Sequence, residues 1–258
     1  MMGSFIVLII KGMNMKKVLM VSALLMQLGS SYAQTIGYGG VGAGVSVFTP
    51  ERDVSDTILF DPPLPFPTSY THNQDGGAGA AVSAFLGLKQ HINVFGIAVE
   101  LGGKLSSAEA KGKINNYAFN NVTAESIIRE QGSVNLSVLP SIDINRHANI
   151  FLRAGIARGH YELKSNADTG GNLIATGKTT EWVNGFIVGG GLETMITCSM
   201  SMRFEYDYSR YHSITQRSVL PPDININSDI ILSKVRPQDH TLMVSFILNT
   251  DAGRMFQS

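Results

Sequence analysis

The chain has 258 residues, of which 16% are charged and 44% hydrophobic, and its 20 basic and 20 acidic side chains balance at pH 7. This balance excludes nucleic acid as a partner, because nucleic acid requires a concentrated basic face. The single cysteine, Cys198, excludes an internal disulfide, and the six histidines are scattered without the spacing of metal ligands. We therefore expect neither a metal nor any other cofactor.

Residues 1–33 have the pattern of a secretory signal peptide. From Met15 the chain reads two lysines, an apolar run and then Ser31-Tyr32-Ala33, which is a small-residue cleavage site. We expect this segment to be removed, with Met15 as the start of translation. Three of the 20 basic side chains lie in it, which leaves 17 against 20 acidic ones in the mature chain. After Gln34 no apolar run reaches the length of a spanning helix.

The mature chain alternates between apolar and polar or small residues in eight stretches. In Met202–Ser209, for example, Met202 and Phe204 fall on one face while Arg203 and Glu205 fall on the other. A period of two residues predicts β-strands. In chain order the predicted strands are Ile36–Phe48, Ala78–Leu88, Val94–Leu105, Gln131–Pro140, Asn149–Tyr161, Thr180–Glu193, Met202–Ser209 and Asp239–Leu248.

Long polar connections and short links alternate between these strands. The long ones are 49–75, 106–129, 162–179 and 211–235; the short ones are 89–93, 141–148 and 194–199. A soluble sandwich has no reason to sort its loops in this way, whereas outer-membrane barrels combine short periplasmic turns with long external loops. The sequence therefore predicts an all-β fold, an eight-stranded antiparallel up-and-down transmembrane β-barrel over 34–250, followed by a short tail over 251–258. We expect aromatic residues near strand ends to form interfacial girdles: Phe48, Trp182, Tyr208 and Phe246.

Several segments resemble the small eight-stranded outer-membrane proteins of Gram-negative bacteria, the OmpA-like and opacity-type surface antigens. They are Lys16–Ala33, Val99-Glu100-Leu101-Gly102, Gly189-Gly190-Gly191-Leu192-Glu193 and Arg203–Tyr208. The resemblance implies a bacterial outer-membrane protein with an adhesin-like or surface-antigen role. The partners it implies are outer-membrane lipid and lipopolysaccharide, the barrel-assembly machinery, and a host or extracellular ligand bound through the loops.

The predicted strands direct charged side chains into the barrel. An eight-stranded barrel is only wide enough for side chains to fill it, so buried charges there must pair. We predict one ion-pair network that closes the lumen, formed by Glu100, Lys104, Arg153, Arg203, Glu205 and Asp207. By the same alternation Glu193 also points inward.

The external loops are the predicted functional part, because exposed apolar groups often mark partner sites. The candidate contacts are Phe66, Tyr117, Phe119, Ile224 and Ile226, which could instead pack on one another. Two other classes stay open: a small channel, and a lipid A-modifying enzyme that uses His212 and Ser213. Neighbouring residues of a strand point to opposite faces, so we expect no catalytic site at this pair.

Overall fold

The computed structural model describes residues 34–53, 73–117, 122–169, 172–219 and 230–250. The expected signal peptide (1–33) and tail (251–258) lie outside these ranges. Every regular element within them is a strand, and none of the described residues forms a helix long and apolar enough to cross a membrane.

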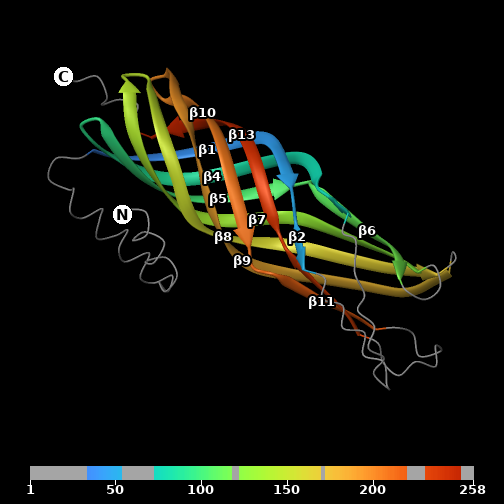
Figure 1. Ribbon diagram of the computed structural model, residues 1–258. Coiled ribbons are helices and arrows are strands. Elements are labelled where there is room, and N and C mark those ends of the chain that lie inside the picture. Colours follow the sequence, from blue (N-terminus) through green and yellow to red (C-terminus); the bar gives the residue numbers. More distant parts are fainter. Residues whose placement is uncertain (1–33, 54–72, 118–121, 170–171, 220–229, 251–258) are drawn as a thin grey trace, which may run out of the picture.

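Eight strands close into an antiparallel barrel (Figure 1), which confirms the predicted fold. Each is hydrogen-bonded to the next around the ring, and the last pairs with the first. In ring order they are β1 (Gln34–Phe48), β4 (Gly77–Ile92), β5 (Phe95–Ser106), β7 (Val122–Asn145), β8 (Ala148–Thr169), β9 (Asn172–Thr197), β10 (Met200–Tyr211) and β13 (Gln238–Asn249).

At one end of the barrel, tight turns join the described strands in pairs. β4 and β5 are joined at Asn93–Val94, β7 and β8 at 146–147, and β9 and β10 at 198–199. Asn93 has a φ of 56°, the left-handed conformation that asparagine tolerates better than most residues. The turns at 146–147 and 198–199 fall inside the predicted short links, and the first turn extends one residue past its link to Val94, which was predicted to begin a strand.

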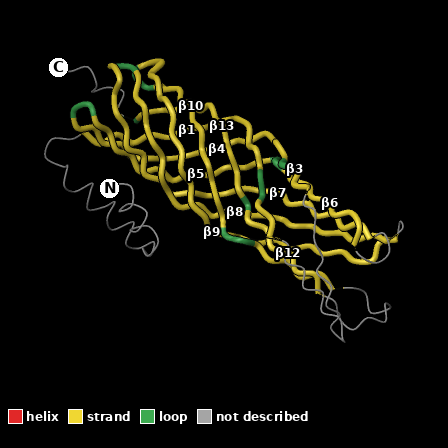
Figure 2. The backbone as a smooth tube through the Cα atoms, in the orientation of Figure 1, coloured by secondary structure: helices red, strands yellow, loops and turns green. Residues whose placement is uncertain are grey.

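At the other end the wall continues far beyond the predicted strands (Figure 2), so the predicted loops 106–129 and 162–179 are wrong as loops. β7, β8 and β9 contain 24, 22 and 26 residues. β6 (Glu109–Tyr117) takes over from β5 along the outer half of β7, and β3 (Asn73–Asp75) pairs with β6. In the predicted loop 211–235, β11 (Ile214–Val219) and β12 (Ile230–Arg236) pair, and β12 also pairs with β2 (Glu51–Asp53).

Around the barrel proper, the outward-facing residues are apolar and exposed and form what we call the apolar belt. Its members include Val41, Val45, Leu86, Leu101, Leu152, Val188, Leu192, Phe204, Tyr206, Leu242, Val244 and Phe246. The residues between them in sequence point inward; most are small or polar, and a few, such as Phe85, Phe151 and Met243, are apolar. This is the arrangement that lipid demands, because the apolar face meets hydrocarbon and the polar face is enclosed.

Beyond the belt the polarity reverses. We call this part, formed by the outer halves of β7–β9 together with β2, β3, β6, β11 and β12, the extension. A core of apolar side chains fills its interior, namely Phe48, Ala108, Ala110, Ile128, Ala157, Tyr161, Leu163, Val183, Ile187, Tyr211, Ile214 and Val235. Its outer surface carries ion pairs, including Glu109–Arg129 and Glu162–Lys178.

Phe48 corrects one prediction. We expected it in an outer aromatic girdle, but it is fully buried in the core of the extension and stacks on Tyr161 with ring centroids 5.9 Å apart. The reason lies in the alternation along β1, where Val45 and Val47 are exposed and the even-numbered residues point inward.

Candidate functional site

The lumen of the barrel is the most highly charged part of the described interior, and β10 supplies three of its charged side chains. Along this strand Arg203, Glu205 and Asp207 are 2%, 7% and 6% exposed, while Phe204 and Tyr206 between them are 43% and 48% exposed. On the neighbouring strand β9, glycines leave room for these side chains. A Cβ on Gly189 would collide with the backbone oxygen of Tyr206 as well as with the carboxylate of Asp207, so only glycine fits there.

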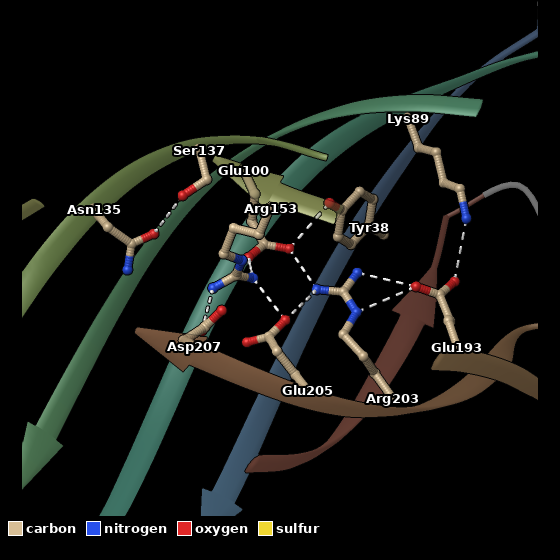
Figure 3. A network of polar contacts seen from close by, with 10 residues as sticks. All are labelled: Tyr38, Lys89, Glu100, Asn135, Ser137, Arg153, Glu193, Arg203, Glu205 and Asp207. Atoms are coloured by element: carbon tan, nitrogen blue, oxygen red, sulfur yellow. Dashed lines mark hydrogen bonds and ion pairs between the residues drawn. The ribbon is translucent and has the colours of Figure 1, made fainter. Parts of the chain in front are cut away.

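Glu100 on β5 is the centre of the network in Figure 3. It is fully buried, accepts hydrogen bonds from the Tyr38 hydroxyl at 3.1 Å and from Arg203 Nη1 at 2.7 Å, and forms an ion pair with Arg153. A buried carboxylate is tolerated when it is paired and hydrogen-bonded in this way.

The two arginines carry the network across the lumen. Arg153 Nη2 lies 3.0 Å from Glu205 Oε2, and its Nη1 lies 3.2 Å from Asp207 Oδ2. On the other side, Arg203 Nη2 lies 3.0 Å from Glu193 Oε2, and Glu193 in turn pairs with Lys89 at 3.4 Å.

Aromatic rings support Arg203. Its guanidinium carbon lies 5.6, 4.9 and 5.0 Å from the ring centroids of Tyr38, Phe85 and Phe151. These distances allow cation–π attraction, which is stronger away from water. Arg203 therefore sits between carboxylates and an aromatic cluster, and the network fills the lumen at this level.

Lys104 belongs to a second cluster nearer the extension. It pairs with Glu130 at 3.2 Å and with Asp239, which also accepts hydrogen bonds from the hydroxyls of Ser46 and Thr241. A cavity of about 30 Å³ lies between the two clusters, enough for a water molecule, and both Glu100 and Lys104 line it. Beyond the second cluster lies the apolar core of the extension.

Of the six residues predicted to form one network, the structure brings Glu100, Arg153, Arg203, Glu205 and Asp207 together and places Lys104 apart. The prediction did not include Tyr38, Lys89, Glu130 and Asp239, and it counted Glu193 only as an inward charge. Asp239 could have been found, because it alternates in phase with Thr241 and Ser245. Glu130 could not, because it lies at a register shift between β7 and β8.

The predicted loop contacts stay predictions. Phe66, Phe119, Ile224 and Ile226 lie outside the described residues. Tyr117 ends β6, where its backbone pairs with Val122, and its side chain is not described.

The described residues do not assemble a catalytic triad around His212. Its Nδ1 contacts the backbone carbonyl oxygen of Asn184 at 2.7 Å, and the nearby acids Glu205 and Asp207 are engaged with Arg153 inside the lumen. Within the described ranges, no three His, Cys, Asp or Glu side chains come close enough together to hold a metal ion.

A closed antiparallel barrel with an apolar belt and a charged lumen defines a transmembrane β-barrel protein of the bacterial outer membrane. Residues 18–247 match the family model of the outer membrane protein beta-barrel domain, and the chain belongs to that family. No curated protein matches the chain.

Three solved structures illustrate what the chain is similar to. OprG, an outer membrane protein from Pseudomonas aeruginosa, is 9% identical with a TM-score of 0.47, and the alignment covers 84% of this chain and 97% of that one. The outer membrane protease OmpT from Escherichia coli is 10% identical with a TM-score of 0.42, covering 83% and 96%. Ail, the attachment invasion locus protein of Yersinia pestis, is 10% identical with a TM-score of 0.37, covering 83% and 98%. Identities this low carry no information on activity.

Proposed function

We propose that this protein is a surface-display barrel, an adhesin-like surface antigen whose lumen is closed and whose extension meets a ligand outside the cell. The role needs a stable anchor in the membrane and a defined surface beyond it. The lumen network supports the first requirement, and the extension supports the second.

The reversal of polarity along the wall carries this proposal. A tilted strand crosses a bilayer in about 9–11 residues, yet β9 has 26. The surplus length has an apolar interior and ion pairs on its outer face, which is how a sheet folds in water. Crossing the membrane does not require this part. A β-structured extension with its own core holds its tip at a fixed distance from the lipid, as a binding surface requires.

Conductance tests the closed lumen. Glu100, Arg153 and Arg203 are each no more than 6% exposed and link opposite walls of the barrel. The purified protein, inserted into planar lipid bilayers, should therefore give no steady single-channel current. Large steady currents from the unmodified protein would contradict the closed lumen and favour a small channel.

Labelling of intact cells tests the orientation. Lys111 and Lys178 on the extension have side chains 61% and 60% exposed, whereas Lys89 near the turns is 13% exposed and paired. A membrane-impermeant amine reagent should label the first two lysines and leave Lys89 unlabelled, as read by peptide mass spectrometry. Labelling only after the outer membrane is permeabilised would place the extension in the periplasm and overturn the proposal.

Adhesion tests the ligand-binding role. Cells that express the protein should bind immobilised extracellular-matrix proteins or host-cell glycans better than cells without it. The substitutions Ile224→Ser and Ile226→Ser should reduce the gain. Ile196→Ser is the matched control, because Ile196 is 52% exposed near the tight turns, away from β11 and β12. If cells with and without the protein bound these ligands equally well, the adhesin role would be contradicted.

Lipid A analysis tests the alternative of an enzyme. Lipid A extracted from cells with and without the gene should have the same mass spectrum, since the triad around His212 is not assembled. A mass difference that His212→Ala abolishes would replace the display proposal with a lipid A-modifying enzyme.

A further inference from the structure

The lumen opens into a pocket at the end of the barrel that carries the tight turns. The pocket has a volume of about 300 Å³. This volume corresponds to about ten water molecules, and sites for small molecules begin at about this size. Its walls are the inward-facing ends of β1, β4, β7, β8, β9, β10 and β13, and two of the tight turns contribute to its rim. The mouth of the lumen is therefore large enough to hold a small molecule.

The ion-pair network closes the inner end of this pocket. Lys89 and Glu193 line the pocket and pair with each other at 3.4 Å, and Glu193 also pairs with Arg203 at 3.0 Å. All three belong to the network that fills the lumen (Figure 3). A molecule that enters the pocket therefore leaves through the same opening, so the pocket is suited to binding and not to passage.

The charges that line the pocket are balanced in number, but they are not all paired. Two cations, Lys89 and Arg146, stand against two carboxylates, Asp143 and Glu193. Arg146 is an exposed residue of the turn between β7 and β8, and it forms no ion pair with any residue that the structure describes. A lining without net charge favours a ligand without net charge, and the unpaired guanidinium can bind a negative group of that ligand.

Two acceptors lie side by side in the wall of the pocket. Asp143 on β7 and Asn149 on β8 are paired directly across the two strands. Asp143 Oδ2 lies 3.6 Å from His91 Nδ1, which is too long for a strong hydrogen bond. Asn149 Oδ1 is buried and accepts no hydrogen bond from the described residues. Buried acceptors in folded proteins nearly always have a donor, so this one favours a ligand that brings an N–H group.

We propose that the pocket binds a small zwitterion of dipeptide size, a molecule with one free carboxylate and one free ammonium group. Arg146 binds the carboxylate, to which its planar guanidinium presents two parallel N–H groups. Asp143 binds the ammonium group, and Asn149 Oδ1 accepts a hydrogen bond from the amide N–H between the two charges. The pocket lies at the tight turns and the extension at the other end of the wall, so the inference is independent of the proposed adhesive ligand.

The test is isothermal titration calorimetry on the full mature protein, refolded in detergent, with three probes. They are alanyl-alanine, N-acetyl-alanyl-alanine, which lacks the ammonium group, and alanyl-alanine amide, which lacks the carboxylate. We expect alanyl-alanine to bind at least about tenfold more tightly than either capped probe, because each cap removes a charge-assisted hydrogen bond. Equal affinity for all three probes, or no measurable binding of alanyl-alanine, would overturn the proposal.

Two variants test the role of each charged group. In Arg146→Gln the preference for alanyl-alanine over its amide should disappear, while the preference over the acetylated probe should remain. In Asp143→Asn the opposite pattern is expected. Arg146→Gln breaks no described ion pair, so the barrel should still fold, and the change in gel migration on heating checks this.

Arg158→Gln is the matched control. It also removes an exposed arginine that has no carboxylate partner among the described residues, but from the outward face of β8. This variant should bind all three probes like the wild type. An Arg146→Gln variant that keeps the wild-type preference for alanyl-alanine over its amide would show that Arg146 does not bind the carboxylate, and would contradict the proposal.

Discussion

At the scale of single residues, the paired charges of the lumen stabilise the barrel, and removing any one of them should lower the free energy of unfolding. Glu100 is fully buried and meets Arg153, Arg203 and Tyr38. Loss of one partner leaves the other charge buried and uncompensated, and this penalty exceeds the net contribution of the intact pair.

We therefore expect Glu100→Ala and Arg153→Ala each to lower the free energy of unfolding by about 3–5 kcal/mol. The double variant should lose less than the sum, with a coupling of about 0.5–3 kcal/mol. Urea titrations of the protein folded in lipid vesicles measure all three. Additive losses would show that the two side chains are not coupled.

Glu162 gives a pH dependence at the same scale, outside the membrane. Hydrogen bonds from Lys164 and Lys178 lower the pKa of its carboxyl to about 2. A carboxyl with a lowered pKa stabilises the fold above its ordinary pKa of about 4.3, and the contribution is lost as pH falls towards 2. The wild type should therefore unfold at a higher temperature than Glu162→Gln at pH 6, and the gap should close by pH 2.

Thermal unfolding followed by tryptophan fluorescence would measure this gap, because Trp182 lies on the neighbouring strand. Glu125→Gln, which changes an exposed carboxyl of β7, is the control and should show a smaller gap at pH 6. A gap for Glu162→Gln that persists unchanged at pH 2 would mean that the lysine contacts do not stabilise the extension.

At the scale of strands, the sequence predicted what lies in the membrane and missed what lies outside it. The eight membrane strands were recognisable because apolar residues recur on the outward positions. In β8 the same alternation continues through Tyr161, Glu162, Leu163 and Lys164, but with the polarity exchanged: the inward positions become apolar and the outward ones charged. The prediction requires apolar residues on the outward positions of a strand. This requirement is no longer met beyond Tyr161, so the rest of β8 is predicted as a loop.

Two further features of the site were beyond sequence reasoning. The register shift near Glu130 changes which residues of β7 face inward, and nothing in the sequence marks it. The inward charges form two clusters because they lie at two different depths along the barrel axis. That depth depends on how the tilted strands are aligned with one another around the barrel. Alternation gives the face of each residue but not its depth, so Lys104 could not be separated from Glu100.

Charge insertion tests the assignment of faces. Val188 is 42% exposed on the apolar belt, and Leu136 also faces outward. Val188→Arg and Leu136→Arg should each cost about 2–4 kcal/mol near the bilayer midplane. Thr180→Arg, on the outward face of the extension, should change stability by no more than about 0.5 kcal/mol.

Ser137→Arg provides the comparison for the lumen, because Ser137 is 1% exposed and points inward. It should be destabilising through crowding and should not depend on the thickness of the bilayer. The quantity to measure is the free energy of unfolding in vesicles of two lipid chain lengths. Equal tolerance of all four substitutions would mean that the strand faces are wrongly assigned.

At the scale of the whole molecule, closure of the ring leaves no unpaired strand edge in the membrane. The pairing of β13 with β1 satisfies the last backbone groups, as lipid requires. We expect the folded protein to resist detergent at room temperature and to migrate differently on a gel after heating. Recovery of the mature chain as a soluble periplasmic monomer would contradict a membrane barrel.

The reversal of polarity along the wall also gives the two parts of the molecule different responses to temperature. The extension buries its core, including Ile128, Tyr161 and Leu163, away from water, whereas the apolar belt stays in contact with lipid. Removing apolar surface from water gives a large heat-capacity change, and its stabilising effect fades on cooling. The extension should therefore loosen near 0 °C while the barrel beneath it stays closed. Hydrogen exchange at 5 and 25 °C would show this as a selective loss of protection in the outer halves of β7–β9, so that cold alone would loosen one part of the molecule while the part in the membrane stays folded.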